Sequence, residues 1–177
     1  MIALFFILLG SIAFTYFGYP LLLTIVGARR RDRGTHTRAE DALPTLTLLI
    51  VAHNEENVLP AKLENSLSLD YPRHRLEIVV ASDASTDGTD AIARTWADRG
   101  VRLIRRPERG SQTGAQNYAA PRSRGSILVF SDANTMYDRA ALRRLVRHFD
   151  DPTVGCVVGR LAHSNAGDTA VSFGEEL

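Results

Sequence analysis

The sequence predicts an α/β fold: a mostly parallel sheet with helices on both faces, preceded by one transmembrane helix. Between residues 45 and 177, short apolar runs alternate with segments of helical periodicity, which is typical of strands joined by crossover helices. The runs are almost continuous in Val, Ile and Leu, as in strands that are covered on both faces. Residues 2 to 28 form a different region, because none of them carries a charge.

The uncharged N-terminal segment is long enough to cross a membrane, which takes roughly 20 apolar residues. A cleaved signal peptide is the alternative. The segment lacks a basic start, is longer than a typical signal core, and ends in Gly27-Ala28-Arg29, which is a poor cleavage site. We therefore interpret residues 1–28 as a transmembrane anchor.

A cluster of arginines follows the anchor at positions 29, 30, 31 and 33. Positive residues beside a membrane segment are retained in the cytosol, so the N-terminus should lie outside and the rest of the chain in the cytosol. We interpret residues 29–44 as a basic cytosolic linker; it can be solvated and disordered, attracted to anionic membrane lipid, or both. The net charge is only +1, which gives a nucleic-acid partner no electrostatic support.

The elements of the domain at 45–177 follow in order along the chain. We expect strands at 46–51, 76–80, 101–104, 127–130 and 154–158. We expect helices at 55–67 with Asn54 as its cap, at 89–98 ending at Gly100, at 112–120 closed by Pro121, and at 139–149. Cys156, the single cysteine, lies in the last strand run and is expected to be a buried thiol.

Two acidic stretches, residues 82–89 and 130–135, each follow an apolar run directly. Ligands of open parallel sheets bind outside the carboxyl ends of the strands, so carboxylates from two strands can converge on one cleft. The alternative for either stretch alone is a strand-to-helix turn, since Asp, Ser, Thr and Gly are ordinary turn and cap residues. The two stretches together favour a nucleotide-diphosphate site.

The first strand delivers residues 52–56 to the same edge. Asn54 and the helix start behind it offer amide donors to an anion, and a carboxylate at Glu55 or Glu56 can bond a base or ribose. A capping box explains these residues nearly as well. After the second strand, Asp83 can accept the N3 proton of uracil, which cytosine lacks, whereas Asp87 more simply shapes the turn.

Asp132 and Asn134 are placed to hold a cation, since residues at i and i+2 share one side of an extended backbone. Their oxygens match Mg²⁺ or Mn²⁺, which would stabilise charge on a departing diphosphate. Arg105, Arg106 and Arg109 flank a glycine-containing loop and either meet phosphate or sugar hydroxyls or form a solvated basic loop. No phosphate-binding P-loop or dinucleotide fingerprint is present in the sequence.

The order of these motifs resembles family 2 glycosyltransferases, which are inverting enzymes with a GT-A fold. Residues 51–56 are similar to the family's P-x-Y-N-E, 83–89 to D-G-S-x-D-G-T, 109–117 to G-G-K-x-x-A-L-N and 131–134 to D-x-D. The resemblance implies a UDP-sugar donor, a polysaccharide or lipid/glycan acceptor, a base contact at Asp83, metal at Asp132 and Asn134, and a site in the bacterial inner membrane. The donor-binding set implied is Ala52, Asn54, Glu55, Asp83, Arg109, Gln112, Asn117, Ser131 and Asp132.

The chain departs from that pattern at His53, Gln112 and Asn134, where Tyr, Lys and Asp are usual. The family's catalytic base in an E-D motif and its Q-x-x-R-W have no counterpart before Leu177, so we expect the donor-binding half of a transferase, inactive alone and paired with a C-terminal half or partner subunit. One alternative is a non-catalytic nucleotide-sugar-binding or membrane-interaction module from a truncated gene. A nucleotidyltransferase would need a further activating Lys or Arg that the sequence does not identify.

Overall fold

The computed structural model describes residues 2–30 and 42–160. The chain divides into two compact units, Met1–Thr37 and Arg38–Leu177. Most of the expected linker at 29–44 lies outside the described residues, as do residues 161–177.

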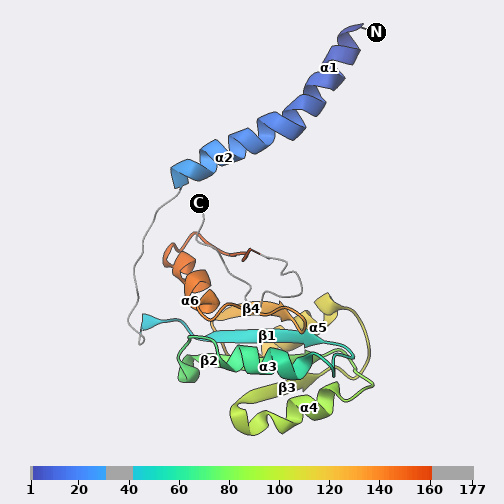
Figure 1. Ribbon diagram of the computed structural model, residues 1–177, viewed down its shortest axis with the longest axis vertical. Coiled ribbons are helices and arrows are strands. Elements are labelled where there is room, and N and C mark those ends of the chain that lie inside the picture. Colours follow the sequence, from blue (N-terminus) through green and yellow to red (C-terminus); the bar gives the residue numbers. More distant parts are fainter. Residues whose placement is uncertain (1, 31–41, 161–177) are drawn as a thin grey trace, which may run out of the picture. The chain divides into compact units, whose positions relative to one another are not determined.

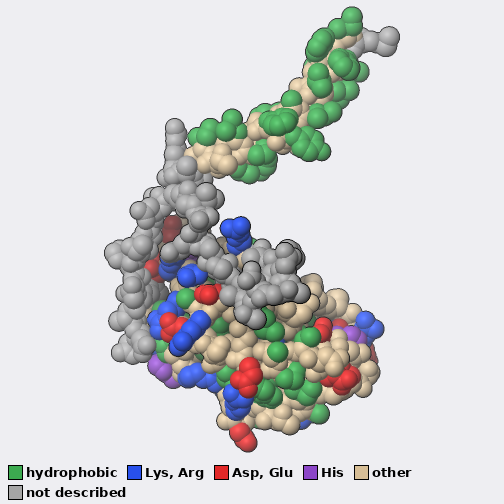
Figure 2. Space-filling view, in the orientation of Figure 1, with side chains coloured by type: hydrophobic (Ala, Val, Ile, Leu, Met, Phe, Trp, Pro, Cys, Tyr) green, Lys and Arg blue, Asp and Glu red, His purple; other side chains and the backbone are tan. Residues whose placement is uncertain are grey.

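The first unit is helical: α1 spans Ile2–Ala13, a π-helical turn covers Phe14–Gly18, and α2 spans Tyr19–Arg30 (Figure 1). Within the described residues, the 24-residue stretch Ile2–Ile25 is long and apolar enough to cross a membrane, and hydrophobic side chains line the face of it that Figure 2 shows. The π turn precedes Pro20, whose ring clashes with a carbonyl one turn back in a regular α-helix. Thr15 donates its hydroxyl to the Ser11 carbonyl at 2.8 Å, which satisfies this polar group without water.

The second unit is built on a parallel sheet of four strands in the order β3-β2-β1-β4 (Figure 1). Its strands are β1 Leu46–Ala52, β2 Leu76–Ser82, β3 Val101–Arg105 and β4 Ile127–Asp132. β1 lies in register with both neighbours, since Leu46 is opposite Leu76 on one side and Ile127 on the other. The parallel sheet expected from the Val, Ile and Leu runs is confirmed.

Helices cover both faces of this sheet. The α-helices are α3 Leu59–Leu67, α4 Thr89–Thr95, α5 Gln112–Ala119 and α6 Ala141–Val146. Single 3₁₀ turns lie at Arg73–Arg75, Ala97–Arg99, Ala120–Arg122 and Arg147–Asp150. Gly100 ends the 3₁₀ turn after α4 in a left-handed conformation, φ 87°, as its place in the sequence predicts.

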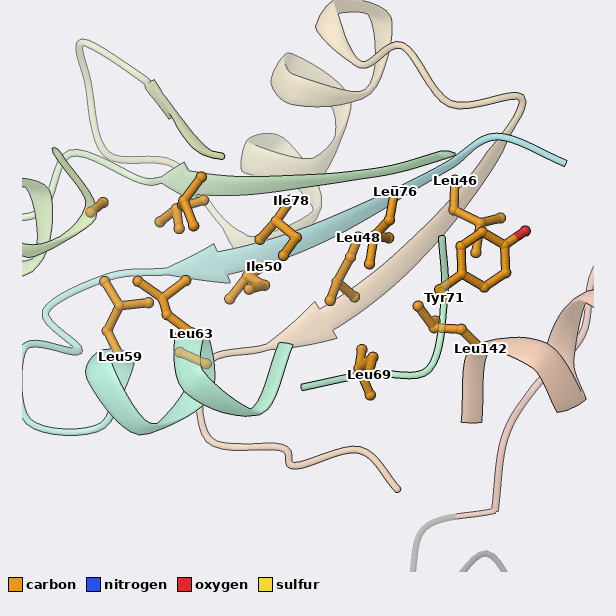
Figure 3. Packing of buried hydrophobic residues seen from close by; sticks show 14 of the residues in the cluster. Leu46, Leu48, Ile50, Leu59, Leu63, Leu69, Tyr71, Leu76, Ile78 and Leu142 are labelled. Atoms are coloured by element: carbon orange, nitrogen blue, oxygen red, sulfur yellow. The ribbon is translucent and has the colours of Figure 1, made fainter. Parts of the chain in front are cut away.

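The core divides at the sheet according to the alternation of side chains along the strands. Leu48 and Ile50 of β1 point to one face, where they join Leu63 of α3 and Leu142 of α6 (Figure 3). Leu49 points to the other face, in a smaller cluster with Val79, Ile104 and Ala119, the last of these from α5. β1 is buried on both faces and pairs with β2 and β4, so it holds the carboxyl ends of these neighbouring strands in fixed positions beside its own.

Three expectations about elements are wrong. Residues 154–158 form no strand: they lack regular structure, and Val158 is 88% exposed, because no neighbouring strand pairs with them in the described part of the chain. Cys156 is consequently exposed rather than buried. The first helix of the sheet unit begins at Leu59, so Asn54 lies outside it and is not its cap.

Candidate functional site

The carboxyl ends of the four strands meet at one edge of the sheet. Ala52 at the end of β1 lies opposite Ser82 at the end of β2, which lies opposite Arg105 of β3. On the other side of β1, Val51 lies opposite Asp132 at the end of β4. The residues predicted from sequence lie at these strand ends or in the segments that follow them, apart from Gln112 and Asn117 on α5.

The segments after β1 and β2 interlock. Asn54 has a left-handed backbone, φ 57°, and its side-chain oxygen accepts a hydrogen bond from the Thr86 amide at 2.8 Å. The Asn54 amide donates to the Ser85 hydroxyl at 3.2 Å, and the Glu55 amide donates to the Thr89 hydroxyl at 2.8 Å. Asn54 therefore bridges two turns instead of capping α3, which corrects the sequence-based prediction. A left-handed conformation is one that Asn adopts more readily than most residues.

Asp87 completes the junction between these turns. Its carboxylate accepts hydrogen bonds from the Thr89 hydroxyl at 2.6 Å and the Glu56 amide at 3.1 Å. Glu56 returns the contact by accepting from the Gly88 amide at 2.7 Å. Burial by itself would raise the pKa of Asp87, but the hydrogen bonds from Thr89 and Glu56 outweigh it and lower the pKa. These bonds give Asp87 a structural role.

Asp83 is buried, with 4% of its surface exposed, and the chain itself neutralises its charge. Arg106 Nη1 donates to Oδ1 at 2.8 Å, and the Gly110 amide donates to both carboxylate oxygens at 3.1 Å. Among the described residues, Oδ2 accepts one hydrogen bond, and a carboxylate oxygen has room for two. A ligand donor can therefore reach this carboxylate only at Oδ2, unless the loop that carries Gly110 moves.

Gly110 is required by close approach. A Cβ atom at this position would lie 2.1 Å from Arg106 Nη1, well inside van der Waals contact. The Arg106 guanidinium could move away only by giving up its ion pair with Asp83. The glycine in this loop therefore serves the Asp83 contact.

The three arginines at the end of β3 and in the loop after it have different environments. Arg105 pairs with Asp90 at 3.0 Å, and Arg106 pairs with Asp83. Arg109 is exposed on the connecting loop. The guanidinium groups of Arg105 and Arg106 therefore each face a carboxylate of the chain, and contact of any of the three arginines with phosphate or sugar stays a prediction.

Asp132 and Asn134 are both exposed, on either side of the buried Ala133. The sequence predicted that both residues lie on an extended strand, and this prediction is wrong. β4 ends at Asp132, and the Thr135 amide donates back to the Asp132 carbonyl at 3.4 Å to form a turn. Gln112, the first residue of α5, donates its side-chain amide to Asp132 Oδ1. The structure thus brings together two residues, Gln112 and Asp132, that the sequence assigned separately to the site.

The oxygens of Asp132 and Asn134 fit a weakly held cation. The described residues contain no group of three or more His, Cys, Asp or Glu side chains that could enclose a metal ion. Mg²⁺ commonly takes one or two protein oxygens and completes its shell with phosphate oxygens and water. One carboxylate and one amide therefore suit a cation that a diphosphate helps to hold.

The other predicted residues divide into two kinds. Ala52 and Ser131 are buried, and the Ser131 hydroxyl donates to the Asp132 carbonyl at 3.1 Å. Asn117 is exposed on α5, five residues after Gln112 and therefore about 140° around the helix from it. Helix geometry thus does not bring Asn117 to the side of α5 that contacts Asp132.

Sequence reasoning missed the residues that support the turn after β4. Lys62 of α3 is fully buried and donates to the Thr135 carbonyl. Asn65 of α3 donates to the Tyr137 carbonyl at 2.9 Å and accepts from the Tyr137 amide at 2.8 Å. One signal was present in the sequence: Lys62 is the single lysine among 21 basic residues, and it lies on the apolar stripe of its helix.

Comparisons with known proteins agree with this geometry. The chain is 34% identical over 134 residues to a beta-monoglucosyldiacylglycerol synthase of Synechocystis, a match that covers 73% of this chain and 27% of that relative. It is 32% identical over 136 residues to the probable glycosyltransferase YdaM of Bacillus subtilis, covering 73% of this chain and 32% of the relative. The chain thus spans about a third or less of the length of these relatives.

Solved structures share the fold. A mannosyltransferase from Pyrobaculum calidifontis, in complex with GDP-Man and Mn²⁺, matches with a TM-score of 0.67 and 32% identity, covering 82% of this chain and 44% of that one. Staphylococcus aureus TarS in complex with UDP matches with a TM-score of 0.56 and 20% identity over 60% of this chain and 32% of that one, a likeness of fold alone. The GT-A fold implied by the sequence motifs is confirmed.

The model of the family described as glycosyl transferase family 2 matches residues 47–175, which include the sheet, both acidic turns and α5. The chain belongs to glycosyl transferase family 2.

Proposed function

We propose that the sheet unit binds the donor, a UDP-sugar, of an inverting glycosyltransferase that acts on a polysaccharide, lipid or glycan acceptor. The observation that carries the proposal is the convergence of Asp83 and Asp132 on one sheet edge, from strands that flank β1 on opposite sides. The complex of the Pyrobaculum calidifontis mannosyltransferase with GDP-Man and Mn²⁺ supports a nucleotide-diphosphate ligand.

The two ends of the cleft have separate tasks in this proposal. The base lies against Asp83, whose Oδ2 atom accepts the N3 proton of uracil while Arg106 pairs with Oδ1. The diphosphate lies toward Asp132, Gln112 and the exposed Arg109. Ala52, Asn54, Glu55 and Ser131 shape the walls between these ends, and donor contact at Asn117 would require an approach from another side of α5.

A divalent cation, Mg²⁺ or Mn²⁺, would be held by Asp132 and Asn134 together with diphosphate oxygens. When bound, it supplies positive charge that stabilises the leaving diphosphate. The residues of the chain orient the donor beside it: Gln112 fixes one oxygen of Asp132 and leaves the other free to face a ligand. The general base of the transfer is not assigned to any of these residues.

We also propose that the helix Ile2–Ile25 anchors the protein in a membrane, with the sheet unit in the cytosol, the compartment expected to hold activated sugars. The length and apolar composition of this helix support the anchor. The arginine cluster at 29–33 supports the orientation, because it follows the helix directly.

Nucleotide titration of the full chain in detergent micelles tests the proposed ligand. Calorimetry with UDP, CDP and GDP in the presence of Mn²⁺ should give the tightest binding for UDP, at least about tenfold tighter than CDP, since a charge-assisted hydrogen bond contributes about 1.5 to 3 kcal/mol. In Asp83→Asn the preference for UDP should vanish. Absence of binding by any nucleoside diphosphate would refute the proposal.

Reporter fusions after Arg38 test the orientation. A cytosolic fluorescent reporter should be bright and alkaline phosphatase silent at this position. Replacement of Arg29, Arg30, Arg31 and Arg33 by Asn should weaken that bias. Strong phosphatase activity with the native cluster would contradict the cytosolic location and, with it, access to the donor.

A further inference from the structure

Lys62 is a buried charge that the proposed function does not use. It lies on the inner face of α3 beside Leu59 and Leu63, and none of its surface is exposed. Moving an ammonium group out of water costs several kcal/mol unless its partners compensate. Burial accordingly lowers the pKa of Lys62 to about 8, although attraction to Asp132 acts in the opposite direction.

The partners of Lys62 all belong to the segment that follows β4. Its Nζ atom donates to the Thr135 carbonyl and lies 4.2 Å from the centre of the Tyr137 ring, within reach of a cation–π interaction. The electrostatic attraction to Asp132 reaches the start of the same segment. A single buried ammonium group therefore interacts with three positions of the turn that carries the candidate cation ligands.

Asn65 reinforces this contact from the same side of α3. It lies three residues after Lys62, so the two side chains are neighbours on the helix surface. Its side-chain amide makes two hydrogen bonds with the backbone of Tyr137, one donated at 2.9 Å and one accepted at 2.8 Å. Between Asp132, where β4 ends, and Ala141, where α6 begins, no described residue belongs to a strand or helix, so these side chains supply backbone bonds that regular structure does not.

We infer that Lys62 and Asn65 are positioning residues that hold the Asp132–Asn134 turn in the shape that binds the cation. The inference rests on the proposed function for the identity of the ligand, but the holding of the turn can be measured without it. Neither residue needs to touch the nucleotide or the ion, because both act through the backbone at Thr135 and Tyr137.

The sign of the Lys62 effect separates positioning from simple electrostatics. A nearby positive charge repels a divalent cation, so if Lys62 acted by charge alone, its removal would tighten cation binding. If Lys62 positions the turn, its removal weakens binding. In Lys62→Met the new side chain is similar in length to lysine and is apolar, so it can fill the same buried space. The variant therefore tests the loss of the hydrogen-bond donor and of the charge without a large change in packing.

The experiment measures UDP affinity of the full chain in micelles, with Mn²⁺ and with EDTA, in Lys62→Met and Asn65→Ala. Removing a residue that orients metal ligands typically costs 10–100-fold in metal affinity, so each variant should weaken UDP binding about tenfold in Mn²⁺ and leave it unchanged in EDTA. Ser66→Ala is the matched control: Ser66 is equally buried on α3, but its hydroxyl bonds the Lys62 carbonyl at 2.7 Å and not the turn. It should change neither affinity.

Hydrogen exchange of the Tyr137 amide gives a second measurement that needs no ligand. Exchange should be faster by about fivefold in Lys62→Met, which loses one hydrogen bond to the turn worth about 1 kcal/mol, and faster still in Asn65→Ala, which loses two. It should be unchanged in Ser66→Ala. Tighter UDP binding in Mn²⁺, equal losses in Mn²⁺ and EDTA, or unaltered Tyr137 exchange would each overturn the inference. A native chain that binds no UDP refutes the proposed function instead, and the exchange rates then still decide whether Lys62 and Asn65 hold the turn.

Discussion

Asp83 and Asp132 both follow a strand of the same parallel sheet, yet the chain surrounds the two carboxylates differently. Asp83 is buried, paired with Arg106 and bonded by the Gly110 amide. Asp132 is exposed and receives one side-chain hydrogen bond, from Gln112, among the described residues. The chain thus neutralises the charge of Asp83 and leaves the charge of Asp132 available. A neutralised carboxylate in a fixed position suits recognition of a neutral base, and an available carboxylate suits binding of a cation.

The largest expected difference between the two ends is in stability. Asp83→Ala leaves the guanidinium of Arg106, which is 23% exposed, without its partner, and breaking such a largely buried pair costs about 3 to 5 kcal/mol. Asp132→Ala should change the free energy of unfolding by less than about 0.5 kcal/mol, as is usual at exposed sites. Urea unfolding followed by the fluorescence of Trp96, the single tryptophan, measures both in the sheet unit. Equal costs for the two variants would contradict the contrast.

The next largest effect is a pH dependence of the free energy of unfolding. It comes from Lys62, which bonds the turn after Asp132. Its pKa is lowered from 10.5 to about 8, so between these pH values the unfolded chain holds a proton that the folded chain has released. The free energy of unfolding therefore rises with pH across this window, by about 3 kcal/mol in total, while below pH 8 the cost of the buried charge stands in full.

Lys62→Met removes this contribution. Urea unfolding of the two proteins from pH 7 to 10.5 should show a native curve that gains stability relative to the variant as pH rises. A constant difference between the two proteins over this range would mean that the folded chain does not release the Lys62 proton early.

Gly110→Ala tests the Asp83 end with a smaller perturbation. The added methyl would lie 2.1 Å from Arg106 Nη1, so the guanidinium must leave Asp83 or the loop must shift, at a cost of about 1 to 3 kcal/mol. Gly155→Ala is the matched control, because nothing lies within 4 Å of its added Cβ atom. Unfolding midpoints in urea should separate the two variants. If Gly110→Ala is as stable as the control, the loop does not depend on the Asp83 contact.

The smallest effect is expected at the exposed Arg109. An exposed cation contributes about 0.2 to 1 kcal/mol to an ion pair, so Arg109→Ala should weaken UDP binding by about threefold. Arg94→Ala removes an exposed cation from the last turn of α4 and should leave the affinity unchanged. Equal UDP affinities for the two variants in calorimetry would exclude Arg109 from the donor site.

Much of the fold could be predicted because strand runs and helix periodicity are local properties. The runs at Leu46 and Leu76 became strands since each found parallel partners on a covered sheet. The run at 154–158 is also rich in Val but has no partner strand among the described residues, and hydrophobic sequence alone does not supply one. The error over Cys156 follows from that, because its burial was inferred from a strand that does not form.

Within the candidate site, sequence identified the residues at strand ends but not their partners. The bond between Asn54 and Thr86 spans 32 residues, and that between Arg106 and Asp83 spans 23. Such pairs depend on how two loops meet in space, which local spacing does not encode. The spacing of Asp132 and Asn134 predicted that they share one side of a strand, whereas the turn after β4 receives hydrogen bonds from Lys62 and Asn65 of α3.

The central claim is that Asp132 contributes a metal-dependent part of nucleotide binding that Asp83 does not. The direct test is the factor by which Mn²⁺ changes UDP affinity, measured by calorimetry on the full chain in the native protein, Asp132→Asn and Asp83→Asn. We predict a factor of about ten or more in the native protein, equal to the factor by which UDP tightens Mn²⁺. Asp132→Asn should reduce this factor to about one without altering UDP affinity in EDTA. Asp83→Asn should weaken UDP affinity both in Mn²⁺ and in EDTA and leave the factor unchanged. A native affinity that is the same with and without Mn²⁺, or a factor that survives Asp132→Asn, would contradict the account.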